Sequence, residues 1–458
     1  MASYDAIIIG TGQSGPPLAQ RLVDAGQKVA IIERKLFGGT CVNTGCTPTK
    51  TLVASAYAAH IVRRAADYGV RVEGAFKVDM KAVKARMDAV VAPSRDGVEQ
   101  SLKTLEGCTV YKGHGRFVAQ KTVAVNVSEL TADHIFLNVG ARAAIPPIPG
   151  LDHVPYLTNS SMMDVDFLPA HLVILGGSYV GLEFGQTYRR FGSEVTVIEG
   201  GPRLIGREDE DVSRAVADFL GEEGIHVRVD SKVVGVEKQG NCIAVKVESA
   251  GALSQVGGTH LLVAIGRRPN TDDLGLDKAG ISTDSRGLIE VDDQLRTNVP
   301  GVWAMGDCNG RGAFTHTSYN DFEIVAANLL DDDPRRVTDR ITAYALYTDP
   351  PLGRAGMTEA EVRKGGRPAL IATMAMEDVS RAYEKGETKG FMKILVDRDS
   401  GLILGGAFLG LAGDEVIHTI LDLMYAKAPY TVMQRAMHIH PTVSEFIPTM
   451  LGDLKPLQ

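Results

Sequence analysis

The stretch that decides the fold is the start of the chain, Ala6-Ile-Ile-Ile-Gly10-Thr-Gly12-Gln-Ser-Gly15. A helical stretch from Leu18 to Ala25 follows, and a second apolar run, 29–33, ends in Glu33. Strand, glycine-rich turn, helix and strand in this order predict a βαβ unit that binds a pyrophosphate at the helix N-terminus. Glu33, 23 residues after Gly10, is placed to accept hydrogen bonds from ribose hydroxyls. We expect a dinucleotide site formed by Gly10, Gly12, Gly15 and Glu33.

The same pattern returns at Leu172-Val-Ile-Leu-Gly176-Gly-Ser178-Tyr-Val-Gly181. A helix from Leu182 and a strand over 194–199 are expected next, and Glu199 again lies 23 residues after the first glycine. Ser178 takes the place of the second glycine. Because its side chain is small, a phosphate can still approach the turn, although with less room. The second predicted site contains Gly176, Gly177, Ser178, Gly181 and Glu199. Two such sites favour FAD together with NAD or NADP, with a hydride passing between the two rings. The alternative is a duplicated scaffold with one inactive site.

A cysteine pair follows the first unit, in Gly38-Gly39-Thr40-Cys41-Val-Asn-Thr-Gly-Cys46-Thr-Pro-Thr-Lys50. Four intervening residues fit one helical turn, so the two sulfurs can bridge. A thiol near a helix N-terminus and a cation has a lowered pKa and is a better nucleophile. A zinc site would need further ligands close by, but the other cysteines, at 108, 242 and 308, are scattered. We therefore expect a redox pair and no metal site; buried structural cysteines are the alternative.

Composition excludes several other classes of protein. The net charge of −8 argues against a nucleic-acid binder that works through bulk charge. The longest apolar candidate, 401–413, is shorter than the roughly 18 residues of a membrane-spanning helix. Five cysteines in 458 residues do not form a secreted disulfide framework, and the first residues lack the basic region of a signal peptide. We expect a cytoplasmic protein with no membrane or nucleic-acid partner.

The cysteine segment resembles the active-site signature of the class I flavoprotein disulfide reductases, the pyridine nucleotide-disulfide oxidoreductases. This family includes dihydrolipoamide dehydrogenase, glutathione reductase and mercuric reductase. The resemblance extends over essentially the whole chain. Its other motifs are Phe136-Leu-Asn-Val-Gly140, Leu262-Val-Ala-Ile-Gly266-Arg-Arg-Pro-Asn270, Gly301-Val-Trp-Ala-Met-Gly306-Asp307 and His440-Pro-Thr-Val-Ser-Glu445.

The resemblance implies a role for each matching residue. Cys41 would be the interchange thiol that attacks substrate, and Cys46 the thiol that lies against the flavin. Lys50 would lie near the reactive nitrogen of the flavin and pair with Glu183. The FAD site would further include Gly39, Thr40, Gly140, Gly266, Gly306 and Asp307, with Asp307 binding the ribityl chain.

The resemblance also implies roles for Tyr179 and for the C-terminal motif. Tyr179 would cover the flavin until nicotinamide displaces it; ordinary packing is the alternative. His440 would be the acid–base group, because a thiolate relay needs a proton acceptor near neutral pH, and Glu445 would fix its tautomer. His438 is the competing candidate, and the proline after His440 favours His440. The family places this pair at the cysteines of the other subunit, which implies a homodimer with shared active sites.

These landmarks predict an α/β fold with two Rossmann-like, glutathione reductase-like dinucleotide-binding domains and a C-terminal α+β dimerisation domain. The expected boundaries are 1–147 for the first FAD segment, 148–270 for the NAD(P) domain, 271–337 for the second FAD segment and 338–458 for the interface domain. The Pro-rich segment 146–149 is the expected linker, and the charged run 331–336 the expected hinge.

The electron acceptor is the part of the predicted activity that the sequence determines least. Ser178, Thr47 and Thr49 favour the mercuric reductase-like branch, whose acceptor is a disulfide or a metal ion. The adjacent cysteines that mercuric reductase carries at its C-terminus do not occur in residues 451–458. Dihydrolipoamide dehydrogenase and a flavin-bearing redox sensor without turnover are the alternatives. NADH is expected over NADPH, because Glu199 would repel a 2′-phosphate, with Arg203 as the competing cation.

Overall fold

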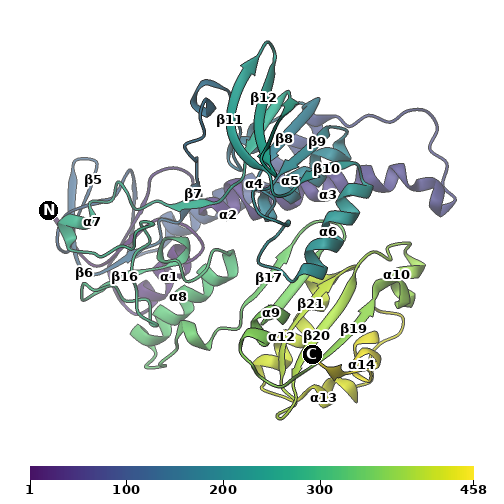
Figure 1. Cartoon of the computed structure of the whole chain (residues 1–458). Helices are drawn as coiled ribbons and strands as arrows, with labels where there is room; N and C mark the ends of the chain where they lie inside the picture. The colour runs from purple at the N-terminus through teal and green to yellow at the C-terminus, as the bar shows by residue number, and fades with distance from the viewer. Residues whose placement is uncertain (458) are drawn as a thin grey trace.

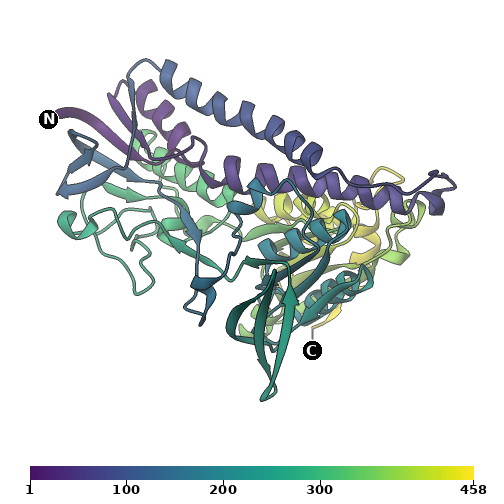
Figure 2. The same cartoon turned by 90° about the horizontal axis from the view of Figure 1, so that it is seen from above.

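Residues 1–457 are described by the computed structural model of the chain. Three groups of sheets lie next to one another in Figure 1. The N-terminal unit is at one side, the unit of residues 171–263 is above the middle, and the C-terminal unit is below the middle. Two long helices, α3 (Cys46–Arg63) and α4 (Met80–Thr104), run side by side from the first unit toward the others, as Figure 2 shows. The α/β architecture is the predicted one.

The first sheet has the order β3-β2-β1-β6-β5-β4, with β16 beside β6. Strands β1, β2, β3, β6 and β16 are parallel, and β5 and β4 continue the sheet antiparallel. β16 is contributed by a segment about 165 residues after β6, so the chain returns to this sheet late. The strands are β1 (Ala2–Ile9), β2 (Val29–Glu33), β3 (Cys108–Lys112), β4 (Arg116–Ala119), β5 (Thr122–Val125), β6 (Ser128–Leu137) and β16 (Val302–Ala304).

The helices of this unit begin at the carboxyl ends of the strands. α1 (Gly15–Asp24) starts three residues before the predicted Leu18, because Pro16 and Pro17 fit its first turn, where backbone N–H groups lack intrahelical partners. α8 (Thr315–Leu330) packs against α1. The expected single turn linking the two cysteines is wrong: α2 (Gly39–Thr44) ends before Gly45, whose φ of −135° and ψ of −117° break the helix ahead of α3.

The second unit repeats the strand order of the first, as β10-β9-β8-β14, all parallel. Its strands are β8 (His171–Leu175), β9 (Glu194–Ile198), β10 (Ile225–Arg228) and β14 (His260–Val263), covered by α6 (Glu210–Glu222) and by an antiparallel sheet of β11 (Lys232–Gln239), β12 (Cys242–Ser249) and β13 (Ala252–Gly258). α5 (Tyr179–Phe191) begins at Tyr179, three residues before the predicted Leu182. The earlier start places Tyr179 at the helix N-terminus.

A short antiparallel pair connects the two units. It is formed by β7 (Ala141–Ala143) and β15 (Arg267–Pro269), which follow Gly140 and Gly266. Both glycines have positive φ, 65° and 143°, a conformation that side chains disfavour. The chain therefore leaves the first unit and returns to it along neighbouring paths.

The C-terminal unit is a six-stranded antiparallel sheet in the order β17-β18-β21-β20-β19-β22. The apolar run 401–413 supplies β21, whose residues are all buried, and within residues 1–457 no helix is long and apolar enough to cross a membrane. The strands are β17 (Ala343–Leu346), β18 (Leu352–Gly356), β19 (Ala369–Ala375), β20 (Phe391–Asp397), β21 (Ile403–Leu409) and β22 (Lys455–Pro456). The helices are α9 (Glu359–Lys364), α10 (Ser380–Glu384), α11 (Gly413–Val416), α12 (His418–Tyr425), α13 (Tyr430–Gln434) and α14 (Phe446–Leu451). α7 (Leu276–Ala279) lies earlier, beside β4.

Candidate active site

A cavity of about 470 Å³ opens at the carboxyl ends of the first parallel strands. This edge is where ligands of open α/β sheets bind. The cavity brings together residues from the predicted FAD motifs and both cysteines. Those of the predicted residues that line it are Gly10, Gly12, Glu33, Gly39, Thr40, Cys41, Cys46, Gly140 and Asp307.

The first glycine turn is packed too closely for side chains. A Cβ on Gly10, whose φ is 107°, would lie 2.2 Å from the Asn138 carbonyl oxygen. One on Gly15 would lie 2.4 Å from the Gly10 carbonyl oxygen, and one on Gly39 would lie 2.9 Å from the Gly12 Cα. The two glycine segments therefore meet backbone to backbone, which leaves room for a phosphate against the turn.

Glu33 ends β2 with its carboxylate held in place. Its Oε2 accepts hydrogen bonds from the Thr11 backbone N–H at 3.1 Å and the Thr11 hydroxyl at 2.7 Å, and its Oε1 accepts one from the Lys35 N–H at 2.8 Å. Among residues 1–457, the buried amide nitrogen of Asn138, another cavity residue, has no hydrogen-bond partner. A fixed carboxylate for ribose and an unpaired donor beside the glycine turn both fit a dinucleotide such as FAD.

Asp307 lies in the same cavity wall and has an ion-pair partner. Its Oδ2 is 3.2 Å from Arg267 Nη2, and burial raises the pKa of this carboxyl. The preceding Gly306 donates its N–H to Asp321 Oδ2 at 2.8 Å, which fixes the turn that presents Asp307. Arg267 directly follows Gly266, which does not itself line the cavity.

The second glycine turn lies outside this cavity and has the same close packing. A Cβ on Gly181 would lie 2.1 Å from the Gly176 carbonyl oxygen. The Glu199 carboxylate accepts hydrogen bonds from the Gly177 and Gly201 N–H groups, both at 2.7 Å. The acid is therefore held at the end of β9 beside the turn, where a nucleotide ribose would bind. Arg203 donates to the Gly206 carbonyl at 3.3 Å, within its own loop.

Cys41 and Cys46 are present as free thiols close enough to share a hydrogen bond. Cys46 is the first residue of α3, and its Sγ lies 3.1 Å from the Thr315 hydroxyl. Hydrogen bonds from Cys41 and Thr315, together with the charge of Lys50, lower the pKa of Cys46 to about 6. The same contact with Cys46, together with burial, raises the pKa of Cys41. Cys46 is therefore the first of the two to lose its proton.

Lys50 and Glu183 connect the cysteine helix α3 to helix α5 of the second unit. Lys50 Nζ is 2.7 Å from Glu183 Oε2, and the Glu183 side chain is only 6% exposed. The second carboxylate oxygen accepts the Tyr347 N–H at 3.1 Å, and Lys50 Nζ lies 4.3 Å from the centre of the Tyr347 ring. The cation is thus held one helical turn from Cys46.

Tyr179 lies between the second glycine turn and the cavity. Its ring meets that of Phe314, a cavity residue, at a centroid distance of 5.6 Å and an angle of 77°. Burial raises the pKa of its hydroxyl.

His440 and Glu445 form a pair on the exposed surface of the C-terminal unit. Nδ1 of His440 is 2.9 Å and 3.0 Å from the two Glu445 oxygens, and the imidazole is 74% exposed. His438 instead faces the Ala436 carbonyl at 3.2 Å. His440 is not among the residues that line the cysteine cavity of its own chain.

Sequence reasoning missed four residues of this site: Asn138, Arg267, Thr315 and Tyr347. Asn138 and Arg267 each lie within a motif of the resemblance, and that motif is the signal that could have identified them. Thr315 and Tyr347 lie outside every motif found in the sequence. Only the fold brings them to Cys46 and Lys50.

Comparisons with protein families agree with this geometry. The profile of the pyridine nucleotide-disulphide oxidoreductases matches residues 4–321, more than half of the chain. The profile of the dimerisation domain of the same family matches residues 342–451. The chain is a pyridine nucleotide-disulphide oxidoreductase.

Known relatives of this oxidoreductase carry three different names. It is 33% identical to the probable pyridine nucleotide-disulfide oxidoreductase RclA of Escherichia coli K12, over 99% of this chain and 100% of the relative. It is 31% identical to a mercuric reductase of Bacillus cereus (95% and 70% covered) and 32% identical to a dihydrolipoyl dehydrogenase of Thermus scotoductus (97% and 96% covered). A solved structure described as the Cu(II) complex of the HOCl-induced flavoprotein disulfide reductase RclA from Escherichia coli matches with a TM-score of 0.90, covering 99% of both chains.

Family membership implies FAD and a pyridine nucleotide as the cofactors of this oxidoreductase, and the matched dimerisation domain indicates a homodimer. The predicted family, fold class and enzyme class are confirmed. The relatives differ in their named substrates, so the family leaves the electron acceptor open.

Proposed function

We propose that this oxidoreductase uses NAD(P)H to reduce a metal ion or a disulfide through Cys41 and Cys46. The observation that carries the proposal is the placement of both sulfurs in one cavity wall, with Cys46 stabilised as a thiolate. FAD would be held by 1–147 and 271–337, and the nucleotide by 148–270. When bound, FAD supplies the two-electron carrier between the nucleotide and the cysteine disulfide.

The two thiols have different tasks in this scheme. Cys46 is the thiolate beside Thr315 and Lys50, and Cys41 holds the proton. Once deprotonated, Cys41 attacks a substrate disulfide and releases one thiol; Cys46 then attacks Cys41, releases the second thiol and closes the Cys41–Cys46 disulfide. Two electrons and two protons leave with the two product thiols.

The proton of Cys41 is taken by His440 of a second subunit. This assignment is supported by the exposed His440–Glu445 pair, which lies outside the cavity of its own chain. Glu445 on Nδ1 leaves Nε2 free to accept a proton. The homodimer would then have two active sites, each formed from both chains.

A metal ion is the acceptor favoured by the relatives. One relative is named for mercury, and the RclA structure is described as a Cu(II) complex. A dithiolate that closes to a disulfide releases two electrons, enough to reduce two Cu(II) ions to Cu(I) or one Hg(II) ion to the metal. Copper is the first ion to test. Thiols of this kind persist in the cytoplasm, where we propose that the enzyme works.

NADH is the proposed nucleotide. The Glu199 carboxylate is fixed beside the second glycine turn, whereas Arg203 is bonded within its own loop. A fixed carboxylate binds the ribose 2′-hydroxyl and repels a 2′-phosphate.

The test is a panel of acceptors with both nicotinamides, run on the wild type and on Cys41→Ser. We expect multiple turnovers with Cu(II) or with a small disulfide, and loss of this turnover in Cys41→Ser. Efficient turnover of lipoamide alone would instead identify a dihydrolipoamide dehydrogenase, the alternative favoured by the relative from Thermus scotoductus. A single turnover with every acceptor would contradict the proposal and favour a redox sensor.

A further inference from the structure

Tyr344 of the C-terminal unit contacts the ring of Tyr179, which lies between the second glycine turn and the cysteine cavity. Tyr344 and Phe314 are stacked at 5.5 Å with an angle of 10° between their planes. Tyr179 stands nearly perpendicular to both, at 5.6 Å from Phe314 and 6.0 Å from Tyr344. Three units of the fold therefore meet in one aromatic cluster, which we call the Tyr179 clamp (Tyr179, Phe314 and Tyr344).

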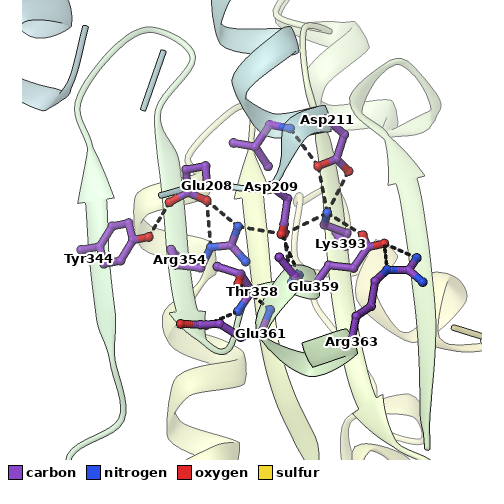
Figure 3. Close-up of polar contacts among 12 residues, drawn as sticks. Glu208, Asp209, Asp211, Tyr344, Arg354, Thr358, Glu359, Glu361, Arg363 and Lys393 are labelled. Carbon is purple, nitrogen blue, oxygen red and sulfur yellow. Dashed lines mark hydrogen bonds and ion pairs between the residues drawn. The ribbon is translucent and has the colours of Figure 1, made fainter. Parts of the chain in front are cut away.

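A buried ion pair fixes the position of Tyr344. Tyr344 on β17 lies directly opposite Arg354 on β18 in the antiparallel register, so both side chains leave the same face of the sheet. Figure 3 shows both reaching Glu208, which precedes α6 of the second unit. The Tyr344 hydroxyl donates to Glu208 Oε1 at 2.5 Å, and the Arg354 guanidinium donates to Oε2, with Nε at 3.0 Å.

This ion pair is almost entirely excluded from water. Glu208 is 3% exposed and Arg354 is 1% exposed. A buried carboxylate that loses a hydrogen-bond donor is destabilised. Moving the Tyr344 hydroxyl away from Glu208 therefore costs free energy, which keeps Tyr344 in position. The neighbouring contacts of Asp209 with Arg354 and Lys393 join the same two units (Figure 3).

The clamp connects the second glycine turn to the cysteine cavity. Tyr179 follows the second glycine turn directly, and Phe314 lines the cavity next to Thr315, the partner of Cys46. One helical turn further along α5, the Glu183 carboxylate forms an ion pair with Lys50 of α3. A nicotinamide that starts from the glycine turn must therefore pass the Tyr179 ring, and moving that ring breaks its contacts with Phe314 and Tyr344.

We propose that Tyr344 is a positioning residue that holds Tyr179 across the nicotinamide path, so that its contact with Tyr179 opposes nicotinamide entry. The proposal rests on the proposed function, because it assumes that a nicotinamide binds at the second turn. An edge contact between aromatic rings corresponds to a factor of roughly 2 to 10 in an equilibrium constant. The apparent Kd of a ligand rises as the fraction of the receptive conformer falls, so a weaker clamp gives tighter nicotinamide binding.

The experiment is calorimetric titration of the FAD-loaded protein with two ligands. One is the 1,4,5,6-tetrahydro analogue of NADH, which has a nicotinamide-like ring but donates no hydride. The other is ADP-ribose, which lacks that ring. We expect Tyr344→Leu to lower the Kd of the analogue roughly fivefold and to leave the Kd of ADP-ribose within about twofold.

Matched variants separate positioning from general damage. Tyr344→Phe keeps the stacked ring, loses only its bond to Glu208, and should give a smaller decrease of roughly twofold. Tyr57→Leu is the control, because the Tyr57 hydroxyl also donates to a carboxylate, Glu387 Oε1 at 2.7 Å, but outside the clamp; it should leave both affinities unchanged.

A double-mutant cycle decides whether Tyr344 acts through Tyr179. In a Tyr179→Ala background, Tyr344→Leu should no longer change the Kd of the analogue. The same decrease in both backgrounds, an unchanged Kd in Tyr344→Leu, or equal shifts for analogue and ADP-ribose would each overturn the proposal. If neither ligand binds the wild type, the proposed function fails as well, which distinguishes the two failures.

Discussion

Replacing Thr315 with valine should raise the pKa of Cys46, because the hydroxyl that stabilises its thiolate is lost. The Thr315 hydroxyl lies 3.1 Å from Cys46 Sγ, and it is one of the groups that lower this pKa to about 6. A hydrogen bond to a charged group contributes roughly 1.5–3 kcal/mol, and the exposure of Cys46 places this one at or below the lower end. We therefore expect an increase of about one pKa unit, equivalent to about 1.4 kcal/mol.

The assay is a pH titration of the FAD-loaded protein in a Cys41→Ser background, where Cys46 is the only thiol of the pair. A thiolate against the flavin gives a long-wavelength absorption band, so the band reports the ionisation of Cys46. In this background Thr315→Val should raise the midpoint by about one pKa unit and so lower the thiolate fraction at any pH near the midpoint, while well above both midpoints the two proteins should be alike. Thr315→Ser, which keeps a hydroxyl, should behave as the parent.

A midpoint that Thr315→Val leaves within about 0.2 pKa units would refute this reasoning. The stabilisation of Cys46 in this background would then come from Lys50 and not from Thr315. A midpoint that moves equally in Thr315→Ser would show that the change acts through packing of the loop before α8.

Three further outcomes follow from the site. Cys46→Ser should retain FAD but lose the long-wavelength band on two-electron reduction, and a band that persists would mean that the roles of the thiols are exchanged. Mixing His440→Ala with Cys41→Ser chains should restore one of the two active sites in the heterodimer, whereas full activity of a monomer on a sizing column would exclude shared sites. The ratio of kcat/KM should favour NADH; a tenfold preference for NADPH, about 1.4 kcal/mol, would show that Arg203 outweighs Glu199.

The glycine turns and their acids could be predicted from sequence because their function is local. Gly10 must have positive φ beside the Asn138 backbone, and Glu33 must end the next strand, so both are fixed by spacing along one βαβ unit. The same holds for Gly176 and Glu199. Such constraints are visible in a single sequence, and they led to the correct fold class and family.

Residues that meet across units could not be predicted in this way. Thr315 reaches Cys46, and Tyr344 reaches Glu208, only because strands and helices far apart in the chain pack together. The break at Gly45 was missed because the cysteine spacing also fits a continuous helix. The absence of His440 from the cysteine cavity of its own chain agrees with the expectation from the C-terminal motif, which the resemblance places at the cysteines of the other subunit.

The most direct test of the central claim is the redox state of the cysteine pair before and after one equivalent of NADH under anaerobic conditions. Alkylation followed by peptide mass spectrometry reads each cysteine separately, with Cys108, Cys242 and Cys308 as internal controls. We expect Cys41 and Cys46 to be linked in the oxidised protein and both alkylated after NADH, while the three controls do not change. A pair that is in the same state before and after NADH would contradict the role of Cys41 and Cys46 as electron carriers.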